Sequence, residues 1–313
     1  MGDTMIVCIL KYFINRIDDP VTRTLMQQTV DLSTKHIQQV TDIFKVEKLP
    51  IPHGFNDNDV NTDAPRLYTD AFYLTFLSFT ARVCMQNYTL ILNQLARADI
   101  RAFFSKRINE YIDLFNNSTD LRLIKGIAVK APRVEVPKEV QYVKSQSFIT
   151  DWFGEKRPLL TVEITHIFGL IYANLIGRAI STSFGQVSKD KEISDFFFDG
   201  KELSTKLIYQ LSALLTDEGI PIPSSSDSFV TDSTVAPFSD KLMLAHSVML
   251  DSSAEASLGM AMSDTMRSDL QAMYIKYVAL IMKHAKKGAN IMIDNGWLQQ
   301  SPQAIKHENL VEV

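Results

Sequence analysis

Apolar residues recur at helical spacing along four segments of the second half of the chain. From Thr161 to about Val187, isoleucine, leucine and phenylalanine side chains return every three or four residues, which is typical of an amphipathic helix. Thr161 is in the position of an N-cap, and Glu163 follows in the first turn, where a carboxylate favours the helix dipole. The same periodicity predicts three more helices, at about 191–218, 238–263 and 267–295.

The connections between these helices predict their arrangement. The second helix should end at Gly219, because Pro221 follows two residues later. A polar connection of about 18 residues, from 220 to 237, then leads to the third helix. Fully extended, it could reach up to ~60 Å, which is enough to run the length of a bundle. Two antiparallel hairpins joined by a long crossover are the ferritin-like topology, so we predict a ferritin-like four-helix bundle.

Short motifs of the first half of the chain return in the second half at an offset of 170 or 171. The four pairs are Asp31–Lys35 with Glu202–Lys206, Leu49–Pro52 with Ile220–Pro223, Arg97–Ile100 with Arg267–Leu270, and Lys125–Pro132 with Asn295–Pro302. This internal duplication predicts an all-α protein of two tandem ferritin-like four-helix bundles, packed about a pseudo-twofold axis. The predicted boundaries are a first bundle at 1–128, a linker strap at 129–160, a second bundle at 161–298 and a tail at 299–313.

The two copies are not expected to be equal. An offset of 171 would place the start of the first helix of the first copy before residue 1. We therefore expect the first bundle to lack the first two or three turns of its lead helix, with no equivalent of Glu163. Within the linker, Val134–Val143 alternates between apolar and polar residues and predicts an extended strap against a bundle surface.

Composition excludes some classes of protein. Hydrophobic residues make up 46% of the chain, which is enough for two cores, and only 12 Gly and 11 Pro are present, which favours long helices. The net charge of −4, with no run of Lys or Arg, argues against a general nucleic-acid binder. Cys8 and Cys84 both lie in the first copy, and two free thiols would fit a reducing compartment, with a disulfide between them as the alternative. The start of the chain does not resemble a secretory signal, and the apolar stretch Ile167–Ile180 is shorter than the ~20 residues of a membrane span. These features predict a cytoplasmic protein without a membrane span.

One short motif raises the question of a metal. Glu163 and His166 lie one helical turn apart, but ferritin-like di-iron sites need two such motifs and a carboxylate from each other helix. Glu255 and Asp269 lie at suitable heights on neighbouring helices, so one hypothesis is a mononuclear iron or manganese site formed by these four residues. The alternative is that Glu163 stabilises its helix terminus and that the histidine packs at the rim.

Other motifs are interpreted as structural. The acidic segment Asp57–Asp63 resembles the start of a calcium loop, but Thr62 stands where an EF-hand needs glycine and Tyr68 where it needs glutamate. An Arg-x-Asp pair recurs at the start of the last helix of each copy, where it would tie the helix to its surroundings. These pairs are Arg97 with Asp99 and Arg267 with Asp269. No phosphate-binding glycine loop or hydrolase elbow is present, so we predict no catalytic residue and no organic cofactor.

Six motifs together resemble a domain-of-unknown-function family of endospore-forming Bacilli and related Firmicutes. They are Cys8–Phe13, Leu49–Phe55, Asn61–Leu67, Gly154–Pro158, Glu163–His166 and Gly288–Trp297. Members of that family look like tandem ferritin-like bundles related to the coat F type of spore-coat protein. The resemblance implies this fold class and a spore or stress context, but no reaction, substrate or catalytic residue.

Three functions follow as hypotheses. The first is a non-enzymatic structural or interaction protein of sporulation or stress, spore-associated, with spore-coat or other protein partners. The alternative is a metal-binding oxidase or carrier that uses iron or manganese in the second bundle. The third is a carrier of a small ligand, which would require an apolar cavity lined by Met and Phe. The oligomeric state stays open.

Overall fold

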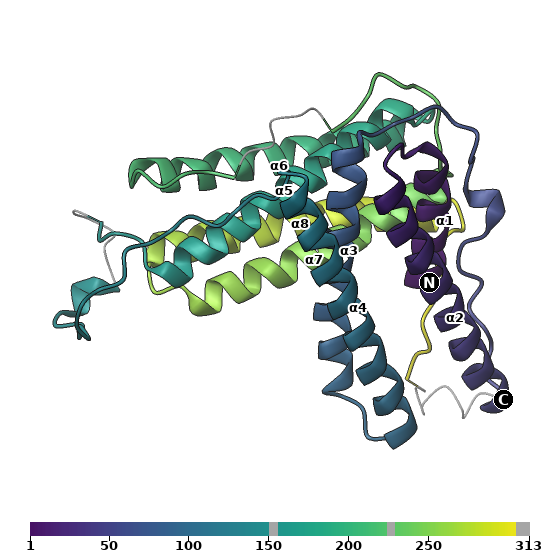
Figure 1. Cartoon of the computed structure of the whole chain (residues 1–313), viewed down its shortest axis with the longest axis horizontal. Helices are drawn as coiled ribbons and strands as arrows, with labels where there is room; N and C mark the ends of the chain where they lie inside the picture. Colours follow the sequence, from purple (N-terminus) through teal and green to yellow (C-terminus); the bar gives the residue numbers. More distant parts are fainter. Residues whose placement is uncertain (150–155, 224–228, 305–313) are drawn as a thin grey trace, which may run out of the picture.

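The computed structural model describes residues 1–149, 156–223 and 229–304, and these fold into eight α-helices in two groups of four (Figure 1). The first bundle consists of α1 (Gly2–Arg16), α2 (Pro20–Val46), α3 (Asp70–Leu92) and α4 (Ala98–Ile124). The second consists of α5 (Thr161–Val187), α6 (Lys191–Asp217), α7 (Asp240–Asp264) and α8 (Ser268–Asp294). The predicted all-α fold with two tandem bundles is confirmed. Gly154 and Glu155 of the linker motif and residues 305–313 of the predicted tail lie outside the described residues.

The helix boundaries of the second bundle agree closely with the predicted ones. Asp190 caps α6, since its carboxylate accepts the backbone N–H of Glu192 at 2.8 Å, and the Ser239 hydroxyl caps α7. α5 begins at Thr161, so its N-cap is Leu160 and not Thr161 as the sequence suggested. Of the long crossover after α6, residues 218–223 and 229–239 are described, and the second of these segments leads to the start of α7 (Figure 1).

The crossovers of the two bundles pair with each other. Antiparallel bridges join Val60 to Phe238 and Tyr68 to Val230. The two bridges are equivalent under the repeat offset of 170, because Val230 is the equivalent of Val60 and Phe238 is the equivalent of Tyr68. Their hydrogen bonds follow the same exchange: Asn61 N donates to the Pro237 carbonyl at 2.7 Å, and the equivalent Thr231 N donates to the Leu67 carbonyl at 3.0 Å. A twofold axis between two copies produces this reciprocity, so the bundles pack as a dimer within one chain.

Aromatic rings fill the contact at this axis. Phe76 of α3 and its equivalent His246 of α7 are both 4% exposed, with ring centroids 5.8 Å apart. Each is also packed by a phenylalanine from the first helix of its own bundle: Phe13 lies 5.1 Å from Phe76, and the equivalent Phe184 lies 6.0 Å from His246. One apolar core therefore extends through both bundles.

The lead helices of the two bundles differ in length. α1 has 15 residues, whereas α5 has 27. At the end of α3, Ile91 is 40% exposed, whereas its equivalent in α7, Ala261, is fully buried. Within Val134–Val143 of the linker, Val134 packs on the second bundle, while Val136 and Val140 are more than 80% exposed.

α5 is long and apolar enough, by length and composition alone, to cross a membrane. In the structure it packs against α6 and α7, and its apolar residues Ile167, Ile171 and Ile176 are fully buried, as in the core helix of a bundle. Cys8 and Cys84 are free.

Candidate functional site

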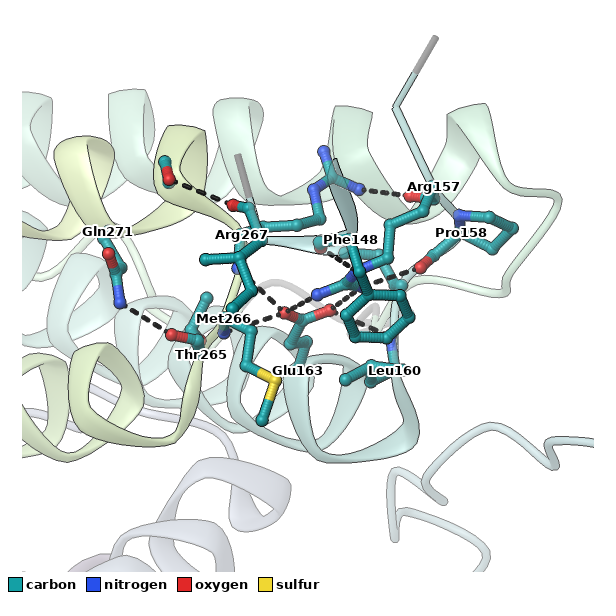
Figure 2. A network of polar contacts seen from close by, with 12 residues as sticks. Phe148, Arg157, Pro158, Leu160, Glu163, Thr265, Met266, Arg267 and Gln271 are labelled. Carbon is teal, nitrogen blue, oxygen red and sulfur yellow. Dashed lines mark hydrogen bonds and ion pairs between the residues drawn. The ribbon is translucent and has the colours of Figure 1, made fainter. Parts of the chain in front are cut away.

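Glu163 lies at the centre of a buried ionic network at the far end of the second bundle (Figure 2). Its side chain is fully buried, and both carboxylate oxygens accept from the Arg157 guanidinium at 2.8 Å. The backbone N–H of Leu160 donates to the same carboxylate at 2.9 Å, which caps the start of α5. Arg157 itself stacks on Phe148, 4.4 Å from the ring centroid. The linker is thereby held to the bundle.

The same carboxylate reaches the start of α8. The backbone N–H groups of Met266 and Arg267 donate to Glu163 Oε1 at 3.3 and 3.4 Å. Burial alone would raise the pKa of Glu163, but the hydrogen bonds from Arg157 and these backbone groups outweigh it and hold the pKa below its usual value. The ionised carboxylate of Glu163 therefore connects the linker, α5 and α8.

Arg267 continues the network. Its guanidinium donates to Asp269 at 2.9 Å and contacts Glu218 at 3.5 Å, and Glu218 accepts the backbone N–H of Leu159 at 2.8 Å. Although burial would raise the pKa of Asp269, hydrogen bonds from Arg267 and from Lys156 at 2.8 Å lower it to about 2. The predicted structural role of the Arg-x-Asp pair fits this arrangement.

The two other predicted metal ligands lie elsewhere. His166 Nε2 is 2.9 Å from the Asp264 carboxylate at the end of α7. Glu255 lies on α7 nine residues before that aspartate, or ~13 Å along the helix axis. Burial, with a contribution from Asp251, raises the pKa of Glu255. Asp251 is itself bonded to His284 Nδ1 at 2.8 Å.

The fit of these residues to a divalent cation is poor in this arrangement. Glu163 and Asp269 are neutralised by two guanidinium groups and an ammonium, and Glu255 is remote from both. Across residues 1–149, 156–223 and 229–304, no three or more His, Cys, Asp or Glu side chains gather so as to hold a metal ion. The iron or manganese site at Glu163, His166, Glu255 and Asp269 stays a prediction.

The first bundle contains a second buried polar network, which sequence reasoning missed. His36 on α2 is 1% exposed, and its Nε2 lies 2.7 Å from the Glu110 carboxylate on α4. Arg107, also buried, forms an ion pair with Asp3 of α1 and donates to the Tyr88 hydroxyl at 2.9 Å. Burial would raise the pKa of Asp3, but the His36 ring, whose Nδ1 lies 3.8 Å from the carboxylate, and the charge of Arg107 lower it. The network joins all four helices.

A signal for this network was present in the duplication. The equivalents of His36 and Arg107 in the second copy are Leu207 and Tyr277, which are buried in an apolar core. Polar residues at positions where the other copy is apolar mark this network. A comparison of the two copies position by position would have found it.

The surface between α2 and α4 also differs between the copies. A groove of about 550 Å³ lies between the start of α2 and the end of α4. Val21 and Ile124, on its two sides, are 58% and 82% exposed. Their equivalents in the second bundle are Glu192 and Asp294. The first bundle therefore has apolar side chains on both sides of this groove, whereas the second bundle has acidic residues at the equivalent positions.

Comparison with known proteins adds the family. A family model described as a protein of unknown function, DUF3231, matches residues 1–140 and 147–310. The chain belongs to the DUF3231 family. Each matched segment contains one bundle, so the DUF3231 unit and the duplicated unit coincide.

One solved structure is similar to part of this DUF3231 chain. It comes from Bacillus halodurans C-125 and is described as a "putative spore coat protein". The two chains are 16% identical with a TM-score of 0.44, and the match covers 48% of this chain and 98% of the other. A search of curated proteins found no match.

Proposed function

We propose that this chain is a non-enzymatic interaction protein that binds a protein partner through the groove between α2 and α4 during sporulation or stress. The observation that supports this most is the exposed apolar rim formed by Val21 and Ile124. Large apolar side chains that rim a groove are typical of a protein interaction site. The sporulation context rests on the resemblance of the sequence motifs to a family of endospore-forming Bacilli.

The second bundle supplies an internal comparison for this groove. At the positions equivalent to Gln28 and Asn117, it has Asp199 and Lys287, which form an ion pair at 2.7 Å across α6 and α8. The same scaffold therefore tolerates a charged, bridged surface at this place. In the first bundle these two positions are uncharged, and the charged groups lie at Asp120 in the groove and at the Lys125–Asp19 ion pair beside it. Such a groove is suited to an amphipathic segment of a partner, whose apolar side would cover Val21 and Ile124.

The test uses the residues of the second bundle as substitutions. The double variant Val21→Glu, Ile124→Asp gives the groove the acidic residues that Glu192 and Asp294 place on the equivalent surface. In a sporulating endospore-former, we expect the wild-type chain in the spore-coat fraction and the double variant in the soluble fraction. Met282→Asp, which replaces a 56% exposed apolar residue on α8, is the matched control and should behave as wild type.

A photocrosslinking amino acid identifies the contact directly. Placed at Thr24 in the groove, it should yield one discrete crosslinked product in sporulating cells. At the equivalent Asp195 of α6 it should yield none. Equal fractionation of wild type and double variant, with no product specific to position 24, would refute the proposal.

A further inference from the structure

Two crevices lie on either side of the contact between α3 and α7. The crevice of the first bundle is lined by α1, α3 and α7. The crevice of the second bundle is lined by α5, α7 and α3, and also by α6 and α8. Phe79, Val83 and Leu250 line both, so they form the wall between them. The volumes differ: the crevice of the first bundle encloses about 350 Å³ and that of the second about 80 Å³.

The chemistry of the two crevices also differs. In the second bundle, hydroxyl and charged side chains line the space, including Ser253, Ser257, Asp251 and Arg82. In the first bundle, apolar side chains dominate, and none of the described residues that line it is Asp, Glu, Lys or Arg. The apolar lining includes Met5, Ile6, Ile9, Phe76, Phe79 and Met249. A volume of this size with an apolar lining lies within the range of small-molecule pockets.

One polar side chain that lines the apolar crevice has a buried atom without a partner. His246, which is 4% exposed, lines the pocket and makes no hydrogen bond to the described residues; its buried Nδ1 is unsatisfied. A buried polar atom without a partner costs free energy, so a ligand that supplies a partner gains affinity there. Burial lowers the pKa of this histidine to about 4, so its ring is neutral at pH 7. A neutral ring in an uncharged pocket suits a hydroxyl or carbonyl group and not a carboxylate.

We propose that the crevice of the first bundle, lined by Met5, Val83, Met249 and His246, binds a small neutral lipophilic molecule that carries one hydroxyl or carbonyl group. The polar group of the ligand bonds to the imidazole of His246 at the contact between the bundles. Its hydrocarbon part lies along Met5 and Val83 toward the mouth. That mouth is at Gly2, Leu90 and Ile91, which are exposed.

The proposal does not depend on the partner groove, which lies between other helices. 1-Octanol is a suitable probe, and octanoate of the same chain length is the matched charged probe. Titration calorimetry of the full chain at pH 7.5 should show saturable binding of 1-octanol. Octanoate should bind at least ~10-fold more weakly, because its carboxylate would lose water without gaining a counter-charge.

Two variants separate the pocket from binding elsewhere. His246→Phe introduces the residue found at the equivalent Phe76, so the packing at the axis is expected to tolerate it. It should weaken the binding of 1-octanol by ~5- to 10-fold, the loss expected for one hydrogen bond, and leave the affinity for octanoate unchanged. Val83→Trp should fill the pocket and abolish binding, with the helical circular dichroism retained as a check of folding. Absent binding of 1-octanol to wild type at its solubility limit, or equal affinity for wild type and His246→Phe, would overturn the proposal.

Discussion

Leu207 and Tyr277 pack in the apolar far end of the second bundle, whereas the equivalent positions of the first bundle hold His36 and Arg107. The helices that carry these residues, α2 and α4 in the first bundle and α6 and α8 in the second, begin and end at equivalent residues, so the same backbone accommodates both interiors. The difference shows what a duplication permits: one copy can exchange an apolar core for a buried ionic network while the other preserves the fold. The shared contact at the pseudo-twofold axis then stabilises both copies.

The helix ends differ in a similar way. Arg267 of the second bundle is 8% exposed in its side chain, while the equivalent Arg97 is 54% exposed, although each pairs with the same two acidic positions. The linker around Arg157 covers the second set, and the described residues place no such cover over the first. Burial and not the choice of residues therefore decides how much each network contributes to stability.

The largest expected effect on stability comes from removing the buried carboxylate of Glu163. Glu163→Ala leaves Arg157 and three backbone N–H groups without their acceptor, and it should lower the free energy of unfolding of the second bundle by about 4 kcal/mol. Hydrogen exchange of peptides from α5 and α8 would measure this loss. Arg97→Ala, in the exposed network, should leave exchange in α3 and α4 nearly unchanged. Comparable losses in the two variants would contradict the role assigned to burial.

The stabilisation by Glu163 should also depend on pH. Since its pKa in the folded chain lies below the usual value of ~4.5, the stabilisation is present above that value and is lost as the pH falls through the lowered pKa. Glu163→Gln should remove this acid dependence.

A smaller effect is expected inside the first bundle. Arg107→Tyr introduces the residue of the equivalent Tyr277, but it leaves Asp3 buried without its counter-ion and should cost about 3 kcal/mol. Adding Asp3→Asn, which matches the equivalent Asn174, should recover most of that loss in urea unfolding, because the unpaired charge is then gone. A double variant no more stable than Arg107→Tyr would show that the two interiors are not interchangeable.

Much of this fold was predictable because it rests on local and repeated signals. Helical periodicity placed α5 to α8, and the offset of 170 predicted two copies of one bundle packed about a pseudo-twofold axis, whereas the pairing of the crossovers is seen only in the structure. The partners of Glu163 were not predictable, because Arg157 lies in an irregular linker whose path no periodicity describes. The pair His36 and Glu110 is separated by 74 residues and depends on helix rotation. Both cases need the tertiary structure.

The smallest expected effect on stability concerns two equivalent helix ends. α2 and α6 both end in a turn that reverses through a left-handed residue, with Leu49 N donating to the Phe44 carbonyl and Ile220 N to the Leu215 carbonyl, each at 2.8 Å. The left-handed residue is Lys48 in the first copy, with φ of 54°, and Gly219 in the second, with φ of 68°. A side chain in this conformation costs roughly 1–2 kcal/mol, which glycine avoids.

Exchanging the two residues tests whether the copies use this turn equally. Gly219→Lys should lower the free energy of unfolding by about 1 kcal/mol, because it introduces the strain that Lys48 already carries. Lys48→Gly should raise it by less than ~1 kcal/mol, since the greater freedom of glycine in the unfolded chain offsets part of the relief. Urea unfolding of both variants measures these shifts. If Lys48→Gly were instead destabilising, the lysine side chain would have to make contacts that outweigh its strain, and the two turns would no longer be equivalent.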